Sequence, residues 1–394
     1  MLIPAQDVSG AGEMGVLARP AGRVGVTRLA LTDYRNYTTA RLDLDAGPVV
    51  LTGPNGAGKT NLLEAVSFLS PGRGLRNAKL GEIDRHGSAS GWAVAATVET
   101  RRGPVRIGTG RDEATGERRI VRIDGEPAKS QAALAERLGL VWLTPQMDRL
   151  FIEGPGARRR LLDRLVFGLD PAHAGRVAAY EQALRERSRL LREPPADGVW
   201  VSALEAVMAE QGVAVAAGRR DAVDRLDRAC AEAEGPFPHA RLALAGALET
   251  WLDEMPALAA EDRFKAALAA DRAADAAVGG ATLGPHRSDL SVTHAEKSVP
   301  AEQASTGEQK ALLIAILLAH AKLQRAIRGE PPIVLFDEVA AHLDRARRAA
   351  LFAMLAELES QAWLTGTDPE LFTPLRGSAR FLTVVDGALS ETAP

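Results

Sequence analysis

The chain has 394 residues, of which 46% are hydrophobic and 25% charged, and this balance excludes a fibrous or largely disordered protein. Its formal net charge of -3 excludes nucleic-acid binding through an overall basic surface, so any contact with DNA must come from local patches. The single cysteine, Cys230, excludes a disulfide framework and favours a reducing, cytoplasmic location.

The first segment, 1–23, mixes proline, glycine and charged residues without the apolar run of an export signal, and we expect a disordered extension there. The longest apolar run, Ala311 to Ala319, is about half of the roughly 20 residues that span a bilayer. The sequence therefore predicts no membrane segment.

Alternating apolar and polar residues predict two strands, at 26–31 and 40–44, around a turn at 35–37. A short apolar run, 48–52, then predicts a buried strand, and apolar spacing predicts a helix over 60–69. A strand, a glycine-rich loop and a helix in this order form the context of a phosphate-binding P-loop.

The glycine-rich loop is the strongest chemical signal in the chain. Its glycines let backbone N–H groups approach phosphates, together with the N-terminus of the following helix. We expect Lys59 to neutralise the β and γ phosphates of ATP and the Thr60 hydroxyl to reach Mg²⁺. The predicted ATP-binding residues are Gly53, Pro54, Asn55, Gly56, Ala57, Gly58, Lys59, Thr60 and Asn61.

Three alternating segments, 93–98, 105–109 and 120–123, predict an antiparallel sheet beside this loop. Gln146 follows them in the order Thr-Pro-Gln. It lies where the Q-loop glutamine of an ABC-type ATPase would reach Mg²⁺ and couple the site to the next part of the chain.

From Ala157 to about Val278 the composition shifts to Ala, Arg, Glu and Leu with helical spacing. The stretch 199–234 predicts one helix of about 50 Å, although Gly212 and Gly218 weaken it. We therefore predict an α/β head formed by 24–150 and 283–394, interrupted by a short helical arm over 151–282.

The segment Ser305, Thr306, Gly307, Glu308, Gln309 permits two interpretations that can both hold. Ser305 and Glu308 form a capping box at the start of a predicted apolar helix, 306–327. A capped helix N-terminus is also an anion site, and this one resembles the signature motif of ABC-type ATPases, which contacts the γ-phosphate bound by the opposite subunit. Its position about 30 residues before Asp337 favours the signature interpretation.

Four apolar residues, 333–336, precede Asp337 and Glu338 and predict a buried parallel strand that delivers two carboxylates at its end. We expect Asp337 to hold Mg²⁺ and Glu338 to polarise the attacking water as general base. Such a run alone is more often a plain strand end, but the P-loop favours the catalytic interpretation.

Two lesser elements follow the acidic pair. Asp344 resembles the D-loop residue that lies along the dimer interface in this class of ATPase. Thr367 and Asp368 lie where transport ATPases place a switch histidine, and a simple turn is an equally good interpretation.

Together these motifs resemble the RecF family of bacterial recombination mediators. The similar segments are 34–37, 55–64, 284–290 and 365–368, and the resemblance extends from about residue 24 to the end. Its specific part is the Gly-Pro-His-Arg segment beside a short arm. Glu308, Ser288 and Glu338 depart from the family's usual glutamine, acid and aspartate.

The resemblance implies an ABC-type, SMC-like P-loop ATPase head with an inserted short helical arm. It implies an ATP-dependent homodimer that requires ATP and Mg²⁺ and hydrolyses ATP weakly, in response to DNA and without nuclease activity. Its DNA would be single-strand gaps and duplex junctions, and it would help its partners RecR and RecO to load RecA during DNA replication, repair and the SOS response.

Basic clusters give the candidate DNA contacts, since phosphates attract lysine and arginine. Many arginine runs are instead solvated faces, and several here adjoin acids. Apart from the region 101–122, the candidates are Arg73, Arg76, Lys79, Arg158, Arg159 and Arg160.

Other ATPases of the same broad class are the alternatives. A transport ATPase places its signature roughly 100 residues after the P-loop, whereas about 245 residues separate Lys59 from Ser305. A long SMC rod needs heptads sustained over many turns, which the glycines and prolines of the insert interrupt. A nuclease would need a further acidic domain after Glu338.

Overall fold

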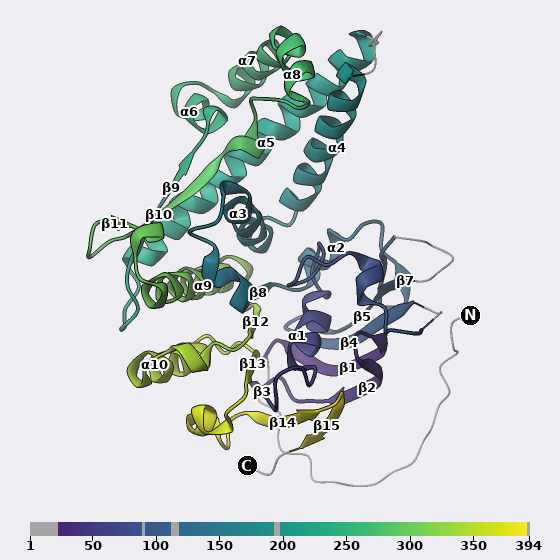
Figure 1. The fold of residues 1–394 in the computed structure, drawn as a ribbon, viewed down its shortest axis with the longest axis vertical. Coiled ribbons are helices and arrows are strands. Elements are labelled where there is room, and N and C mark those ends of the chain that lie inside the picture. The colour runs from purple at the N-terminus through teal and green to yellow at the C-terminus, as the bar shows by residue number, and fades with distance from the viewer. Residues whose placement is uncertain (1–22, 89–90, 112–117, 193–197, 392–394) are drawn as a thin grey trace.

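The computed structural model describes residues 23–88, 91–111, 118–192 and 198–391. The predicted disordered extension lies outside them except for Arg23. Figure 1 shows a head built around two large sheets, from which a group of helices projects as an arm. This arrangement agrees with the predicted α/β head and inserted arm.

A six-stranded sheet forms the centre of the head, in the order β15-β14-β3-β13-β12-β8. All its strands are parallel except the edge strand β15. The strands are β3 (Val49–Thr52), β8 (Leu140–Leu143), β12 (Ile333–Phe336), β13 (Ala362–Gly366), β14 (Arg380–Val385) and β15 (Ala388–Glu391). The predicted buried strands before the P-loop and before Asp337 are therefore both confirmed.

The second sheet is antiparallel, in the order β2-β1-β4-β5-β6-β7. Its strands are β1 (Gly25–Tyr34), β2 (Tyr37–Asp43), β4 (Trp92–Thr100), β5 (Gly103–Arg111), β6 (Ile120–Ile123) and β7 (Glu126–Pro127). They confirm the strands predicted from alternation. The turn between β1 and β2 consists of Arg35 and Asn36, and Arg35 has a positive φ of 55°.

Successive apolar residues of β12 point to opposite faces of the central sheet, and this explains how the layers of the head pack together. Ile333 and Leu335 face one core with α1 (Lys59–Ser67) and the antiparallel sheet. Val334 and Phe336 face the other core, where α9 (Thr306–Arg328) and α10 (Arg345–Glu357) pack. A central strand that is apolar on both faces is thus the feature that unites the two halves of the chain.

The arm is mostly helical, as its composition predicts. Helix α5 (Gly198–Ala231) is continuous through Gly212 and Gly218. A Cβ at Gly212 would lie 2.9 Å from Phe264, so glycine at this position allows close helix packing. The remaining helices are α2 (Ala133–Arg137), α3 (Pro155–Leu169), α4 (His173–Arg192), α6 (Ala247–Glu254), α7 (Ala257–Ala270) and α8 (Arg272–Val278).

One strand within the predicted helical arm was missed. Strand β9 (Ala240–Ala245) pairs with β10 (Asp289–His294), which in turn pairs with β11 (Val299–Pro300). Alanine and leucine alternate in β9, and both residues favour helices in isolation. The strand forms because β10, distant in sequence, supplies its hydrogen bonds.

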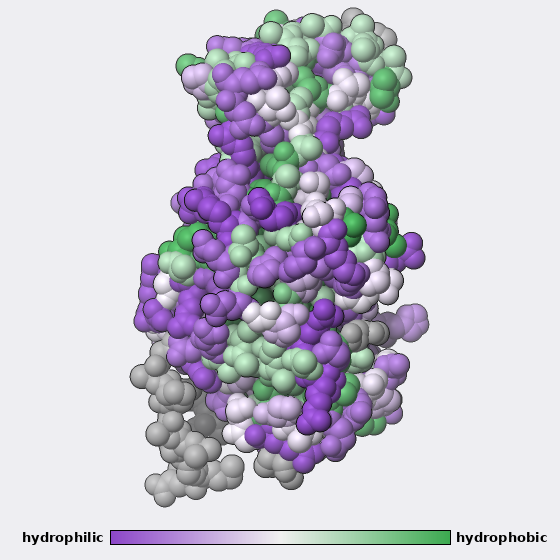
Figure 2. All heavy atoms as spheres, turned by 90° about the vertical axis from the view of Figure 1, so that its left-hand side faces the viewer, coloured by the Kyte–Doolittle hydropathy of each residue, from purple (hydrophilic) through white to green (hydrophobic). Residues whose placement is uncertain are grey.

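The long helix α5 belongs to both the arm and the head. Its near end, including Ala222, Val223 and Leu226, packs in the same core as α9. By length and composition α5 is the one helix in the described part of the chain that resembles a membrane span, with 44% of the relevant window buried. It also carries buried Glu205 and Arg219. Figure 2 shows polar and apolar side chains mixed over one face of the arm, without a continuous apolar belt. We interpret α5 as a core helix.

Candidate nucleotide site

The P-loop joins β3 to α1, and two of its glycines are fixed by close contacts. Gly53 has φ 138°, and a Cβ there would lie 2.1 Å from the carbonyl oxygen of Val384. Gly58 has φ 116°, and a Cβ there would lie 2.6 Å from Asn36 and 2.7 Å from Tyr37. Only glycine meets both requirements, since it alone combines positive φ with no side chain.

The two halves of the chain meet at Thr60. Its hydroxyl lies 3.0 Å from each carboxylate oxygen of Asp337, although the two residues are 277 positions apart. Asp337 is 3% exposed and follows β12, whose neighbour β13 pairs with β3. This arrangement brings together two of the three residues predicted to reach Mg²⁺, Thr60 and Asp337.

Lys59 lies over the loop, where its Nζ donates to the carbonyl oxygens of Gly53 at 2.8 Å and Pro54 at 3.1 Å. The same Nζ is 3.5 Å from Oε1 of Glu338. The predicted phosphate ligand and the predicted general base therefore face each other across the mouth of the P-loop.

Thr365 is a site residue that the sequence interpretation missed. Its hydroxyl donates to Oδ1 of Asp337 at 2.6 Å and accepts from the backbone N–H of Glu338 at 2.9 Å. Glu338 has φ 53°, a left-handed conformation that non-glycine residues rarely adopt. Thr365 thus orients both carboxylate residues. The sequence signal that could have found it is a polar residue at the end of the apolar run 362–364, although the pairing of β13 with β12 sets its role.

The turn after β1 braces the P-loop from the antiparallel sheet. The Tyr37 hydroxyl donates to the carbonyl oxygen of Gly58 at 3.0 Å, and the Asn36 amide donates to that of Ala57 at 3.1 Å. Asn61 donates to Asn36 at 2.7 Å. Asn61 therefore supports the loop through this turn.

A buried carboxylate of α1 engages one of the predicted DNA contacts. Glu64 is fully buried and accepts two hydrogen bonds from Arg35, at 2.7 and 2.8 Å. The guanidinium of Arg76 lies 3.1 Å from Glu64 and 2.6 Å from Asn61. The Glu64 carboxylate raises the pKa of Arg35 through their hydrogen bonds. Arg76 is thus bound within the head.

The signature segment forms the capping box that the sequence predicts. Ser305 caps α9, its Oγ accepts from the Glu308 N–H, and the Glu308 carboxylate accepts from the Ser305 N–H at 3.0 Å. Ser305, Thr306 and Gly307 are exposed. Gln309 is buried and donates to the carbonyl oxygen of Ala304 at 2.9 Å. Across the described ranges no hydrogen bond or ion pair joins this segment to the P-loop.

Gln146 and Asp344 have clear positions, but their proposed roles stay predictions. Gln146 is exposed in the 3₁₀ turn Pro145–Arg149 that follows β8, and the described residues contain no hydrogen bond from it to Asp337. Asp344 caps α10 by accepting from the Arg347 N–H at 2.8 Å. Asp368 caps a 3₁₀ turn by accepting from the Glu370 N–H, which favours the simple-turn interpretation there.

The other predicted DNA contacts divide into bound and exposed side chains. Arg158 forms two 2.8 Å hydrogen bonds with Asp289, and Arg159 donates to the carbonyl oxygen of Ser288 at 2.7 Å. Those two arginines join α3 to β10. The exposed candidates are Arg73, Lys79 and Arg160.

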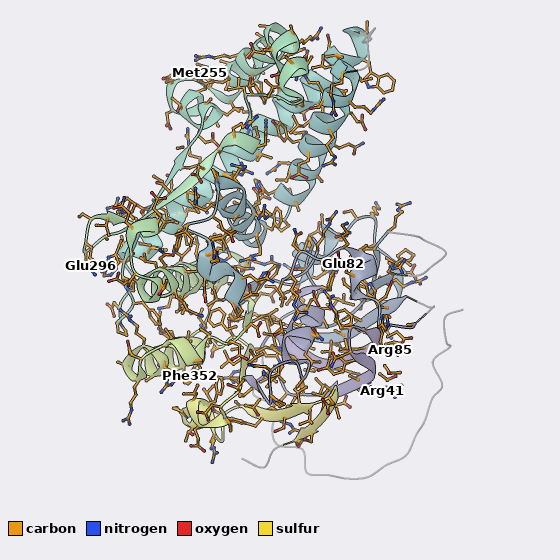
Figure 3. All side chains as sticks on the ribbon, viewed as in Figure 1. Arg41, Glu82, Arg85, Met255, Glu296 and Phe352 are labelled. Carbon is orange, nitrogen blue, oxygen red and sulfur yellow. The ribbon has the colours of Figure 1, made fainter. Side chains whose placement is uncertain are left out.

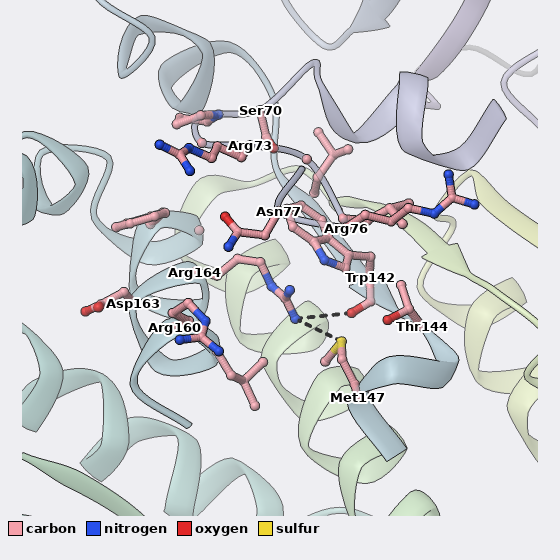
Figure 4. Close-up of a pocket in the computed structure, with 18 of the residues that line it drawn as sticks. Ser70, Arg73, Arg76, Asn77, Trp142, Thr144, Met147, Arg160, Asp163 and Arg164 are labelled. Atoms are coloured by element: carbon pink, nitrogen blue, oxygen red, sulfur yellow. Dashed lines mark hydrogen bonds between the residues drawn. The ribbon is translucent and has the colours of Figure 1, made fainter. Parts of the chain in front are cut away.

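Arg73, Arg76 and Arg160 line one cleft of about 600 Å³ between the loop after α1 and helix α3 (Figure 4). Arg164, from α3, stacks its guanidinium 4.3 Å from the Trp142 ring and donates to the Trp142 carbonyl oxygen. Burial lowers the pKa of Arg164 to about 9. Four arginines and three acidic residues, Glu153, Asp163 and Glu181, line the cleft, which lies beside the turn that carries Gln146.

Residues 25–384 match the family model described as RecF/RecN/SMC N terminal domain. A protein called DNA replication and repair protein RecF, from Mesorhizobium japonicum, is 50% identical over 376 residues, which cover 93% of this chain and 98% of the relative. A protein of the same name from Rhizobium rhizogenes is 48% identical over 375 residues, covering 94% and 99%.

Solved structures show the same fold. A structure described as the recombination mediator protein RecF-ATP in the RecFOR pathway has a TM-score of 0.82 at 21% identity, covering 95% of this chain and 100% of that one. The SMC head domain of Pyrococcus furiosus bound to a domain of ScpA has a TM-score of 0.53 at 17% identity, covering 94% and 96%.

The parallel sheet, the P-loop on β3 and the acidic pair on β12 define an SMC-like P-loop ATPase head. The insert between its two halves is a short arm, unlike a long rod. The chain belongs to the RecF family.

Proposed function

We propose that this chain is a cytoplasmic, ATP-dependent, DNA-binding recombination mediator that acts as a homodimer in DNA replication and repair. One observation carries the proposal: the P-loop half of the site is assembled within the chain, while the signature residues Ser305 to Gly307 are exposed elsewhere on it. A second copy placed head-to-tail would complete two equivalent sites.

Within one subunit, the P-loop amides and Lys59 would bind the phosphates of ATP. Thr60 and Asp337 fit a Mg²⁺ ion, because both present oxygen atoms, the ligand type that Mg²⁺ prefers, and the ion commonly takes its remaining ligands from water and phosphates. When bound, the ion would neutralise charge on the phosphates.

Glu338 is our candidate general base. Its carboxylate lies 3.5 Å from Lys59 Nζ, so it faces the position of the terminal phosphate and would orient and deprotonate the attacking water there. Thr365 would hold the Glu338 backbone in its left-handed conformation. Hydrolysis would be weak and DNA-dependent, and would release the dimer by removing the ligand that favours it.

In this proposal the partner copy presents Ser305 and the first N–H groups of α9 to the γ-phosphate, and Asp344 lies along the dimer interface. Gln146 would reach the Mg²⁺ ion and couple the nucleotide site to the arm. The supporting observation is that the turn containing Gln146 connects β8 to α3 and lines the cleft.

DNA would bind at single-strand gaps and duplex junctions, through exposed basic side chains such as Arg73, Lys79 and Arg160. RecR and RecO would act with the DNA-bound dimer to load RecA, including during the SOS response. The solved relative described as belonging to the RecFOR pathway supports this assignment of partners.

The decisive experiment measures binding to gapped, single-stranded and duplex DNA with and without ATP over a salt series. We expect ATP to strengthen binding, the gapped DNA to bind tightest, and binding to weaken with salt. Equal affinity for all three DNAs, unaffected by ATP, would overturn the mediator function.

A further inference from the structure

The turn between β10 and β11 places Lys297 beside the first turn of α9. Lys297 Nζ forms an ion pair with Oε1 of Glu308. The other oxygen, Oε2, accepts from the Ser305 N–H at 3.0 Å and from the Ser305 hydroxyl at 2.8 Å. Figure 3 shows Glu296, the residue before Lys297, at the outer edge of the molecule. The pair therefore lies at the surface, on the signature face.

Glu308 introduces a negative charge at the place where the signature would meet a phosphate. Its bonds with Lys297 and Ser305 lower the pKa of its carboxyl group to about 2, so it is ionised at neutral pH. It also uses two Ser305 donors that an approaching phosphate would need. A carboxylate and a phosphate at the same helix N-terminus repel each other.

Lys297 is the basic side chain that offsets this charge. The nearest acid on its own turn, Glu296, is engaged elsewhere, since it accepts from the His239 backbone N–H at 3.0 Å and lies 2.7 Å from its Nδ1. Lys297 is half exposed, at 55%, whereas Glu308 is 22% exposed. The lysine can therefore hold the carboxylate while its charge still faces an incoming anion.

We propose that Lys297 is a positioning residue for the phosphate contact across the dimer: by pairing with Glu308 it cancels the carboxylate's charge and lets the signature accept the γ-phosphate held by the other subunit. The inference rests on the proposed function, because it needs an ATP-bound dimer. Lys297 acts through Glu308 and has no direct phosphate contact in this scheme.

The test compares Lys297→Ala, Glu308→Gln and the double variant, each in full-length protein that also carries Glu338→Gln to prevent hydrolysis. Mass photometry measures the ATP concentration at which half of the protein is dimeric. We expect Lys297→Ala to raise that concentration about fivefold to tenfold, because a bare carboxylate then faces the phosphate. Glu308→Gln should not raise it, and the double variant should match Glu308→Gln.

Controls separate this role from a structural one. Lys322→Ala removes the same charge from an exposed lysine on α9, about 21 Å along the helix from Glu308. It should not change the ATP concentration needed for dimerisation. Lys297→Arg should restore dimerisation. Raising the salt concentration should shrink the Lys297→Ala defect, because salt screens exposed charges. Thermal unfolding should be unchanged in Glu308→Gln, since glutamine still caps the helix.

Two results would overturn the inference: no effect of Lys297→Ala, or an equal loss in the Glu308→Gln background, which would mean that Lys297 contacts the phosphate itself. Lys59→Ala separates this failure from failure of the proposed function. If Lys59→Ala abolishes ATP-driven dimerisation and Lys297→Ala does not weaken it, only the role of Lys297 is wrong. If Lys59→Ala still dimerises with ATP, the ATP-dependent dimer itself is wrong.

Discussion

The two surfaces of the head that carry phosphate-binding motifs differ in how complete they are. Around the P-loop, hydrogen bonds and an ion pair join residues from three separate parts of the sequence. These residues are Lys59, Thr60, Asp337, Glu338 and Thr365. At the start of α9, and among the described residues, the hydrogen bonds and ion pairs of the signature residues stay within that helix, the segment just before it and the turn between β10 and β11. One surface is organised by the fold of a single chain, and in our proposal the other acts with a second subunit.

In the proposed function, this contrast would let ATP act as a switch. The P-loop surface can hold a nucleotide in the monomer, but only a second subunit would supply the signature. A ligand that contacts both surfaces favours the dimer by its differential affinity for the two states. The following variants test whether the two surfaces are as different as the structure suggests.

The largest effect is expected for Glu338→Gln. Loss of the general base should lower ATP hydrolysis by about 10³-fold while the ATP-bound dimer persists. Phosphate release and mass photometry would measure the two quantities on the same sample. Glu330→Gln, before the opposite end of β12, is the matched control and should leave both unchanged. A Glu338→Gln protein that stays monomeric with ATP would contradict the proposed dimer.

Lys59→Ala should weaken ATP-driven dimerisation by about 10²-fold, because a buried positive charge at the phosphates is lost. The measurement is the dimer fraction against ATP concentration. Unchanged thermal unfolding would show that the loss is local. Normal dimerisation with ATP would mean that the P-loop surface does not control the signature surface.

Thr365→Val should lower ATP hydrolysis about tenfold and raise the Mg²⁺ concentration needed, because Asp337 and Glu338 lose the hydroxyl that orients them. Thr365→Ser keeps the hydroxyl and should restore activity. Thr367→Val, two residues further on and exposed, should have no effect. Equal activity of the Val and Ser variants would refute an orienting role.

The smallest effects should separate two arginines of α3. Arg158→Ala should lower the free energy of unfolding by about 1–3 kcal/mol, because Asp289 loses its partner. Arg160→Ala should leave stability unchanged and reduce the salt dependence of DNA binding by about one phosphate contact. Chemical denaturation and a DNA-binding salt series measure the two outcomes. If Arg160→Ala lowered stability and Arg158→Ala reduced the salt dependence instead, the α3 surface would be removed from the DNA-binding model.

The sequence predicted the parts of the fold that depend on local patterns. The strands of the antiparallel sheet followed from alternation, and the P-loop and the acidic pair followed from apolar runs that end in reactive residues. The capping box at Ser305 was also predicted, because its two residues lie three positions apart and form a local contact.

Features that depend on distant pairing were missed. Strand β9 has a composition that favours helix and exists because β10 pairs with it. Thr365 gains its role only because β13 lies next to β12. Arg158 and Arg76 were predicted as DNA contacts from their charge alone. In the structure Arg158 binds Asp289, which is 131 residues away, and Arg76 binds Glu64, which is 12 residues away. Sequence patterns report local periodicity, and these contacts are set by topology.

Helix α5 gives the arm a mechanical property, since its near end is part of the head's own core beside α9. Because that end packs in the same core as α9, we expect the arm to turn together with the helix that carries the signature. Over the roughly 50 Å that 34 helical residues span, a rotation of about 10° at that block would move the far end by about 9 Å. The arm would therefore convert a small rotation near the nucleotide into a displacement at its far end comparable to the width of a DNA groove.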